Sequence, residues 1–243
     1  MEISLIIPAY NEEAAIGRCL EAAIKNSHGK FKEIIVVDNA STDRTAEIAR
    51  SYPGVTVVYE ARKGTGNARQ TGFENSNGEI VAYLDSDSHI PEDWVDKIEA
   101  WFADPQVVFL SGAYRYHDCG YLRSLLLDTI WWFSLIAYWM VGYVGNTGNC
   151  AMRASAMHEI GGFDRSILFY GDDTDIARRL HTVGRTIWSL NFYNFSSSRR
   201  FAEQGIFKTY FIYFLNYWWP VLFHRPYSPG HHDLKRETVT LKK

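Results

Sequence analysis

Two carboxylates separated by one small residue, Asp85 and Asp87, follow an apolar run at residues 80–84. The apolar and β-branched residues of this run predict a buried strand, which places both acids at its carboxyl end. In open α/β sheets ligands bind at that edge, and alternate carboxylates there can hold a hard divalent cation against a phosphate. The alternative is a helix-capping loop, because Asp and Ser ahead of Pro91 also suit a helix start.

A second acidic group, Asp172, Asp173 and Asp175, stands at the start of a helical pattern. Asp173 is in register with the apolar positions of that pattern, so it is expected to point inward from the first turn. Solvated acids that cap the helix are the alternative interpretation for Asp172 and Asp175. The apolar positions are Ile176, Ala177, Leu180 and Val183.

The elements that must position these acids alternate between strands and helices. Strands are predicted at residues 3–7, 33–37 and 55–59, with Pro8 ending the first of them. Asn11 is expected to cap the helix that follows the first strand. This alternation predicts a parallel sheet covered by helices on both faces.

Three of the predicted strands end in polar residues, at positions 10–12, at Asp38 and at positions 85–87. A buried strand gains nothing by ending in a carboxylate, so these endings favour a polar ligand and a cation at one sheet edge. Residues 62–69 place three cations beside two glycines, which suits a loop that approaches phosphate. A solvated helix start is the alternative for that loop.

The composition is that of an ordinary globular protein, with 47% hydrophobic and 22% charged residues, so disordered and collagen-like classes are excluded. The 243 residues allow a single compact α/β unit. A formal net charge of -3 gives no basic field for nucleic acid. The three cysteines form no Cys-x-x-Cys pair and the first residues lack a signal-peptide pattern, which predicts a reduced, cytoplasmic catalytic part.

Four motifs follow one another in the first half: Pro8-Ala9-Tyr10-Asn11-Glu12, Val36-Val37-Asp38-Asn39-Ala40-Ser41-Thr42-Asp43, Lys63-Gly64 with Ala68-Arg69, and Leu84-Asp85-Ser86-Asp87. In this order they resemble the motifs of family 2 glycosyltransferases, and the resemblance returns near residue 171. It implies a GT-A fold, which is an α/β fold with a mostly parallel central sheet and helices on both faces. Here an aromatic-rich helical C-terminal part would follow. The resemblance also implies a nucleotide-diphosphate sugar as donor and Mn²⁺ or Mg²⁺ as cofactor.

The same resemblance assigns roles to residues of this chain. Tyr10 would offer a flat face to the base, while Glu12 and Asp38 would accept hydrogen bonds from ring nitrogens or hydroxyls. Asp87 would bind the metal, which neutralises the charge that grows on the leaving diphosphate. The residues implied in donor binding are Pro8, Ala9, Tyr10, Glu12, Asp38, Arg69, Asp85 and Ser86, and those implied in metal binding are Asp85 and Asp87.

The second half of the chain is expected to supply the catalytic base. Asp172 and Asp173 resemble the family's acidic pair, commonly Glu-Asp, whose second acid deprotonates the acceptor. Asp173, with Asp172 beside it, is therefore the predicted catalytic pair. The implied mechanism is an in-line displacement that inverts the anomeric configuration.

Three further residues are candidates for donor or acceptor contacts. Arg199 and Arg200 follow small hydroxyl residues and could clamp a diphosphate or an anionic acceptor, with exposed structural arginines as the alternative. They stand where processive relatives carry Gln-x-x-Arg-Trp, and the absence of that motif favours transfer of a single sugar. Asn149 occupies a position that resembles the acceptor-side strand of the family, and capping of a turn is its alternative role.

Two aromatic stretches, at residues 125–145 and 206–223, flank the predicted base. The first approaches the roughly 20 residues of a membrane span, but one crossing would separate Asp85 from Asp173. Interfacial helices fit better, which favours a lipid-linked or cell-envelope glycan acceptor and contact with the inner face of the cell membrane. An aromatic core or a dimer interface is the alternative.

We therefore expect a nucleotide-sugar-binding half at residues 1–110, an acceptor and base half at 111–205, and an aromatic helix with a basic tail at 206–243. The predicted function is metal-dependent transfer of one sugar to an acceptor hydroxyl, with a UDP-sugar favoured and a GDP-sugar next. A nucleotidyltransferase and a non-catalytic nucleotide-sugar-binding module are the competing hypotheses. The former predicts a Gly-rich basic loop after the first strand, where this chain has Ala9-Tyr10-Asn11-Glu12-Glu13.

Overall fold

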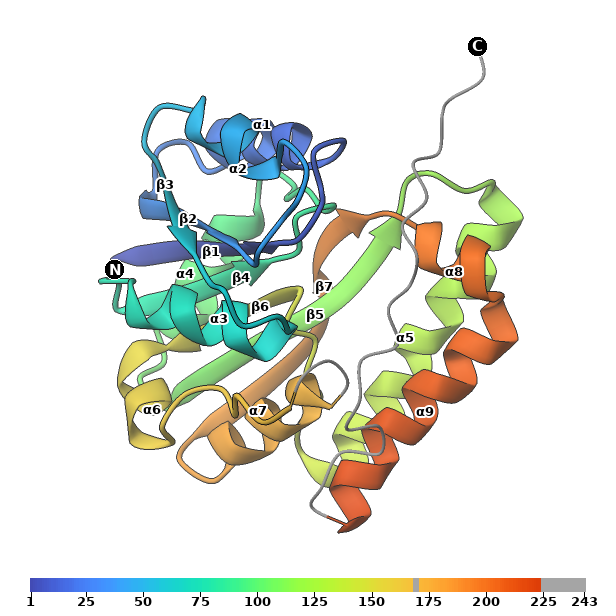
Figure 1. Ribbon diagram of the computed structural model, residues 1–243. Helices are drawn as coiled ribbons and strands as arrows, with labels where there is room; N and C mark the ends of the chain where they lie inside the picture. The colour runs from blue at the N-terminus through green and yellow to red at the C-terminus, as the bar shows by residue number, and fades with distance from the viewer. Residues whose placement is uncertain (168–170, 224–243) are drawn as a thin grey trace.

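The computed structural model describes residues 1–167 and 171–223, and their side chains apart from those of residues 121–123, 200, 202, 203, 220 and 223. One seven-stranded sheet has the order β3-β2-β1-β4-β6-β5-β7 (Figure 1). The strands are β1 (Ile3–Ala9), β2 (Phe31–Asp38), β3 (Val55–Tyr59), β4 (Ile80–Leu84), β5 (Val107–Tyr116), β6 (Asn149–Arg153) and β7 (Arg185–Ser196). The basic tail predicted from the sequence lies outside the described residues.

The sheet is mostly parallel, as predicted. β1 pairs in parallel with β2 and β4, and β2 pairs in parallel with β3. Of these seven strands only β6 runs against its neighbours, between β4 and β5, and β7 returns parallel to β5. The carboxyl ends of β1, β2 and β4 therefore meet at one edge, which is where the polar strand endings lie.

Helices cover both faces of the sheet. They are α1 (Ile16–Asn26), α2 (Thr45–Arg50), α3 (Thr65–Glu74), α4 (Trp94–Phe102), α5 (Tyr121–Val141), α6 (Ala154–Glu159), α7 (Asp172–His181), α8 (Arg199–Gln204) and α9 (Ile206–Phe223). The side chains of β1 alternate between the faces: Leu5 lies in the core with residues of α1, α2 and α4, whereas Ile6 lies in the core with residues of α3, α6 and α7. Two apolar cores, one on each face, thus pack against the sheet whose edge carries the site.

Two details of the first turn differ from the sequence prediction. β1 continues through Pro8, which pairs with Val37 of β2. The proline is tolerated because β4 pairs with β1 only as far as Ile6, so one side of Pro8 has no ladder to interrupt. Asn11 does not cap α1, which begins after Ala15, but takes a positive φ of 52° and accepts a hydrogen bond from the Thr42 backbone N–H.

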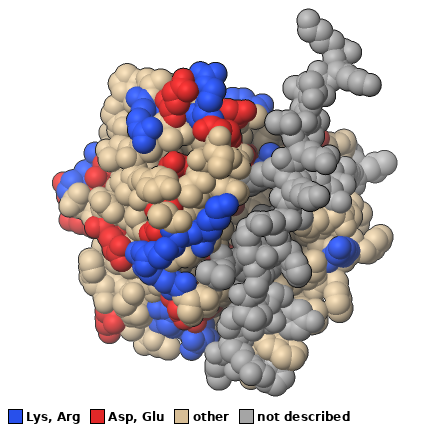
Figure 2. Space-filling view, viewed as in Figure 1, with Lys and Arg blue, Asp and Glu red and all other residues tan. Residues whose placement is uncertain are grey.

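Helices α5 and α9 lie side by side beside the carboxyl-terminal part of the sheet, at the right of Figure 1. The Tyr210 hydroxyl of α9 donates to the Leu126 carbonyl of α5 at 2.8 Å, and aromatic side chains of both helices pack together. Many large apolar side chains of this pair face outward, among them Trp139 at 90% and Phe207 at 84% exposure. In the part of Figure 2 that is not drawn grey, most charged side chains lie away from this side of the molecule, although basic atoms are also visible at its right.

One stretch among the described residues, Ser124–Val141 within α5, is long and apolar enough to cross a membrane, which by itself is weak evidence. Only 11% of that stretch is buried in the protein. In this structure α5 packs along β5 and β7 instead of separating the two halves of the sheet. A continuous sheet from β1 to β7 thus joins the two predicted halves of the chain.

Candidate active site

Asp85 and Asp87 lie in the loop that follows the fully buried strand β4, at the carboxyl edge of the sheet. The Tyr114 hydroxyl of β5 donates to Asp85 Oδ2 at 2.8 Å, and Arg69 Nη2 lies 3.4 Å from Asp85 Oδ1. Burial, and next the Asp85 carboxylate, raise the pKa of Tyr114 well above its usual value, so the phenol remains a donor. These two contacts orient Asp85 while leaving its carboxylate partly exposed.

Arg69 links the loop after β4 to the start of α7. It projects from α3, is almost fully buried, and its Nη1 lies 2.5 Å from Asp172 Oδ2. Thr65, one turn earlier on α3, also donates to Asp172. The interpretation of Asp172 as a solvated cap is therefore wrong: it is a buried ion-pair partner, because the turn before α7 folds it against α3.

Asp173 presents its carboxylate on the other side of that turn. Its Oδ1 accepts hydrogen bonds from the backbone N–H, at 2.8 Å, and from the hydroxyl of Thr147. Within the described part of the chain, Oδ2 of this half-buried side chain accepts no hydrogen bond. Burial, and next the charge of Asp173, raise the pKa of Asp172, against the opposing effect of Arg69.

Breaking the buried ion pair should destabilise the fold. Among the described residues, Asp172→Ala leaves the buried Arg69 with only its longer contact to Asp85. Loss of one partner of a buried pair costs about 3 kcal/mol of unfolding free energy. Asp175→Ala is the matched control on the same helix, because its pairs with Arg178 and Arg179 are partly exposed and worth less than about 1 kcal/mol. Urea unfolding measures the free energy of unfolding of both variants. Equal losses of stability would contradict the assignment of Asp172 as a buried ion-pair partner.

Glycines allow the segment before β6 to approach these acids. A Cβ on Gly148 would collide with the Asp85 carboxylate and the Tyr114 hydroxyl, and a Cβ on Gly145 would collide with the Asp173 carbonyl oxygen. Only residues without a side chain fit at either place. The segment carries Thr147 between them and so holds Asp173 opposite Asp85.

Substitution at Gly148 should therefore disturb the site directly. Gly148→Ala forces Asp85 and Tyr114 apart, and we expect a loss of about 1–3 kcal/mol in unfolding free energy together with weaker donor binding. Gly120→Ala is the control, since a Cβ there meets nothing within 4 Å and its φ of -64° suits any residue. Calorimetric unfolding and donor titration of both proteins check this; a Gly148→Ala protein that matches Gly120→Ala would refute it.

The predicted nucleoside side lies around the ends of β1 and β2. Lys63 Nζ lies 2.9 Å from the Tyr10 hydroxyl and 4.7 Å from the centre of its ring. Asp38 is buried, and its Oδ1 accepts from the Ser41 N–H at 3.1 Å. Pro8 is partly exposed and Ala9 buried in the adjoining β1 segment. The structure thus brings Tyr10 and Asp38 to the same edge as Asp85.

Arg199 reaches this edge from the start of α8. Its Nη2 lies 3.1 Å from Glu12 Oε1 and 3.6 Å from Asp87 Oδ2. The Glu12 side chain is almost fully buried, whereas the Arg199 side chain is 44% exposed. A half-exposed guanidinium held beside Asp87 is placed to contact an anion bound there.

Two of the predicted site residues, Asn149 and Ser86, have buried side chains, and the side chain of a third, Arg200, is not described. Asn149 is completely buried: its Oδ1 accepts from Trp94, and its Nδ2 donates to the carbonyls of Ala113 and Phe192. It thus fastens β6 to α4, β5 and β7. Ser86 is also buried, and the Arg200 side chain lies outside what the structure describes.

Three residues of the site were missed in the sequence. Thr147 and Gly148 could have been found, because paired glycines at 145 and 148 indicate a close backbone approach. Tyr114 carries no such signal, since an aromatic residue in a strand is ordinary. Its role follows only from the pairing of β5 with β6, which brings it to Asp85.

The residues present fit a divalent cation that is shared with a phosphate ligand. Among residues 1–167 and 171–223, no group of three or more His, Cys, Asp or Glu side chains could hold a metal ion. Asp85 and Asp87 offer two partly exposed carboxylates. Mg²⁺ and similar cations in phosphate-handling sites are commonly held by one or two carboxylates plus the substrate phosphates.

The chain is similar in sequence to proteins named as glycosyltransferases. The model of glycosyl transferase family 2 matches residues 4–161. Glycosyltransferase AglE of Haloferax volcanii is 30% identical over 177 residues, covering 70% of this chain and 58% of AglE. The undecaprenyl-phosphate 4-deoxy-4-formamido-L-arabinose transferase of Edwardsiella ictaluri is 35% identical over 104 residues, covering 40% of this chain and 32% of that protein. This chain thus spans less than two thirds of the length of either relative.

A solved structure agrees with the same class. The mannosyltransferase PcManGT of Pyrobaculum calidifontis, in complex with GDP-Man and Mn²⁺, superposes with a TM-score of 0.64 and 25% identity, covering 80% of this chain and 56% of that one. The fold is therefore GT-A. The chain belongs to glycosyl transferase family 2.

Proposed function

We propose that this glycosyltransferase moves a single sugar from a nucleotide-diphosphate sugar to an acceptor hydroxyl, with a divalent metal and inversion of the anomeric configuration. One observation carries the proposal: Arg69 joins Asp85 at the end of β4 to Asp172 at the start of α7. The donor-side carboxylates and Asp173, which is adjacent to Asp172, would then share one reaction centre. Such convergence supports a transfer enzyme over a binding module, which needs no second acid.

The donor would lie along the carboxyl edge of the sheet. Its nucleoside would contact Tyr10 and Asp38, and its diphosphate would lie near Asp87 and Arg199. We favour uridine before guanosine as the base, and GDP-Man in the similar mannosyltransferase supports testing guanosine equally. Mn²⁺ or Mg²⁺ held by Asp87 and Asp85 would neutralise charge on the leaving diphosphate.

Asp173 would act as the general base. Its Oδ2 would take the proton of the acceptor hydroxyl while that oxygen forms a bond to the anomeric carbon. The bond from the anomeric carbon to the diphosphate breaks on the opposite side, and the nucleoside diphosphate leaves with the electron pair. Thr147 fixes Oδ1 so that Oδ2 keeps its direction, and Arg69 positions Asp172 behind it.

A lipid-linked acceptor is supported by the outward face of α5 and α9. Exposed Trp, Phe and Leu side chains on two adjacent helices suit the interface of a membrane, where aromatic residues are favoured. The name of the Edwardsiella relative, an undecaprenyl-phosphate transferase, supports the same acceptor class. Contact with the cytoplasmic surface of the cell membrane would then bring the acceptor to Asp173.

Removal of exposed aromatic residues should weaken membrane contact. Each large apolar side chain contributes about 1.5–3 kcal/mol when buried, so a Trp139→Ser, Phe207→Ser protein should bind phospholipid vesicles at least about tenfold more weakly. Tyr59→Ser is the control, because Tyr59 is equally an exposed aromatic but lies on β3 at the far edge of the sheet. Co-sedimentation with vesicles of phosphatidylglycerol and phosphatidylcholine measures the binding. Unchanged binding of the double variant would exclude the outward face of α5 and α9 as the membrane-contacting surface.

The activity is tested with UDP-, GDP- and dTDP-sugars, Mn²⁺, and prenyl-phosphate and glycan acceptors. Acceptor-dependent release of a nucleoside diphosphate, with a product of inverted anomeric configuration by NMR, is the expected result. Pyrophosphate release from a nucleoside triphosphate and a sugar phosphate would instead establish the nucleotidyltransferase alternative. Metal-independent sugar-nucleotide binding without turnover on any acceptor would favour the binding module.

A further inference from the structure

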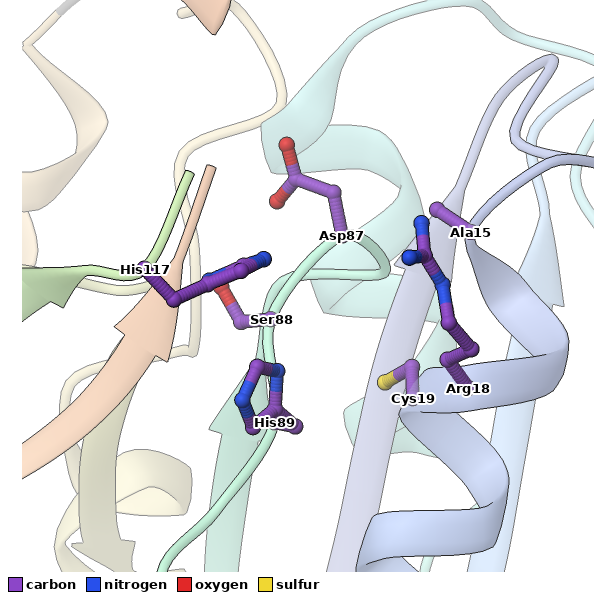
Figure 3. A pocket seen from close by; sticks show the side chains of 7 residues that line it. All are labelled: Ala15, Arg18, Cys19, Asp87, Ser88, His89 and His117. Carbon is purple, nitrogen blue, oxygen red and sulfur yellow. The ribbon is translucent and has the colours of Figure 1, made fainter. Parts of the chain in front are cut away.

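A cavity on the α1 side of Asp87 is separate from the contacts between Asp85, Arg69 and Asp172. Its inner part, about 130 Å³, is lined by Ala15, Arg18, Cys19, Asp87, Ser88, His89 and His117. An adjoining outer part of about 270 Å³ shares Arg18, Asp87 and His117 and extends to Asp118, Ser197 and Arg199. Figure 3 shows Arg18 entering from α1 and His117 from the opposite side, beside the loop that carries Asp87 and Ser88. We refer to this cavity as the Arg18 pocket.

Among the described residues, the polar side chains of the Arg18 pocket that are not engaged in a hydrogen bond or ion pair are a cation and hydrogen-bond donors. Arg18 is exposed and has no hydrogen bond or ion pair within the described part of the chain. The rings of His89 and His117 lie 4.8 Å apart, and His89 is held by stacking on Phe195.

Ser88 is the second, independent indication of a ligand. Its side chain is 1% exposed and lines the inner part of the pocket, yet its Oγ has no hydrogen-bond partner among the described residues. Buried hydroxyls are almost always hydrogen-bonded, so an unpaired one facing a cavity calls for a bound acceptor. The pocket also adjoins Ala15 at the start of the 11-residue α1, whose first turn contains no acidic residue, and a helix N-terminus favours an anion.

The two carboxylates in the lining are already engaged. Asp118 accepts hydrogen bonds from the Ser197 hydroxyl and the Ser198 N–H, and Asp87 lies 3.6 Å from Arg199. What remains available to a ligand is Arg18, the two imidazoles and the Ser88 hydroxyl. This set of donors suits a compact oxyanion.

We propose that the Arg18 pocket binds a phosphate group beside the donor site. Two sources share this chemistry: the diphosphate of the donor and the phosphate of a lipid-linked acceptor. The second is favoured by the fold, because His117 and Asp118 stand just before α5 and Ser197 just before α8, which leads into α9. A prenyl chain along the apolar face of those helices would reach the pocket with its phosphate. This assignment of the source rests on the proposed function.

The test compares Arg18→Gln, Ser88→Ala and the control Arg50→Gln, whose arginine is likewise exposed on a helix but lies on α2. Farnesyl phosphate and farnesol are titrated in EDTA, so that no metal bridges Asp87, and UDP and GDP are titrated with Mn²⁺. We expect farnesyl phosphate to bind about tenfold more weakly to Arg18→Gln, the effect of one lost charge-assisted hydrogen bond, and Ser88→Ala to weaken it less. Farnesol should not distinguish the proteins, and Arg50→Gln should bind as the wild type does.

Each other outcome decides the proposal. If Arg18→Gln weakens UDP or GDP tenfold and leaves farnesyl phosphate unchanged, the pocket binds phosphate and the donor is its source. If Arg18→Gln and Ser88→Ala bind every phosphate as Arg50→Gln does, the pocket is not a phosphate site. Binding of a nucleotide sugar by the wild-type protein in Mn²⁺ tests the proposed function independently of this pocket. If that binding is observed, the proposed function stands even when the pocket is not a phosphate site; if it is absent, the proposed function fails.

Discussion

Asp173→Asn is expected to lower kcat for sugar transfer by about 10²–10⁴-fold, the usual contribution of a general base. Asn retains the shape of the side chain, and its carbonyl oxygen can still accept the Thr147 hydrogen bonds that hold Asp173 in place. Because only the proton-accepting oxygen is lost, the KM for the donor should change little. Steady-state kinetics with a saturating acceptor separates the two effects.

Asp175→Asn is the control for this measurement. Asp175 lies in the same first turn of α7, but it pairs with Arg178 and Arg179 and not with residues of the site. Its kcat should remain within about twofold of the wild type, since changes outside the site rarely alter the chemical step. A normal kcat for Asp173→Asn would exclude Asp173 as the base.

Asp87→Asn should remove most of the benefit that Mn²⁺ gives to donor binding. A carboxylate ligand contributes several kcal/mol to a shared cation, so we expect the Kd of the nucleotide sugar in Mn²⁺ to rise by about 100-fold. Binding in EDTA should change far less, because the nucleoside contacts at Tyr10 and Asp38 remain. Isothermal titration calorimetry with and without Mn²⁺ gives both values.

The comparison protein for Asp87→Asn is Asp96→Asn. Asp96 is an exposed acid of α4 that pairs with Lys30, remote from the sheet edge. It should retain the full Mn²⁺ effect. If Asp87→Asn kept the same ratio of affinities with and without Mn²⁺ as Asp96→Asn, the metal would have to be held elsewhere.

Local sequence patterns were sufficient to predict the elements that carry the site. A run of apolar residues that stops at Asp85 can end only at the edge of a buried strand, and the same argument placed Asp38 correctly. Parallel strands bring such endings together without further information. The fold class and the position of the donor-side acids were therefore accessible from residue types and spacing.

Contacts between distant parts of the chain were not accessible in that way. Arg69 and Asp172 are 103 residues apart, and neither the acid nor the cation shows in sequence that its partner is buried with it. Asn149 illustrates the converse: a polar residue beside glycines resembles a surface turn, yet the antiparallel pairing of β6 places it in the core. Such placements depend on how β5, β6 and β7 assemble, which local patterns leave open.

The central claim is a metal-dependent nucleotide-sugar site at the Asp85 to Asp87 turn, and thermal unfolding of the wild-type protein tests it most directly. A ligand that binds only the folded state stabilises it by about 2.7 kcal/mol at a hundredfold excess over Kd. With UDP-, GDP- and dTDP-sugars, we expect one donor class to raise the Tm in Mn²⁺ and to lose most of that shift in EDTA. A folded protein whose Tm responds to none of these donors in Mn²⁺ would contradict the account.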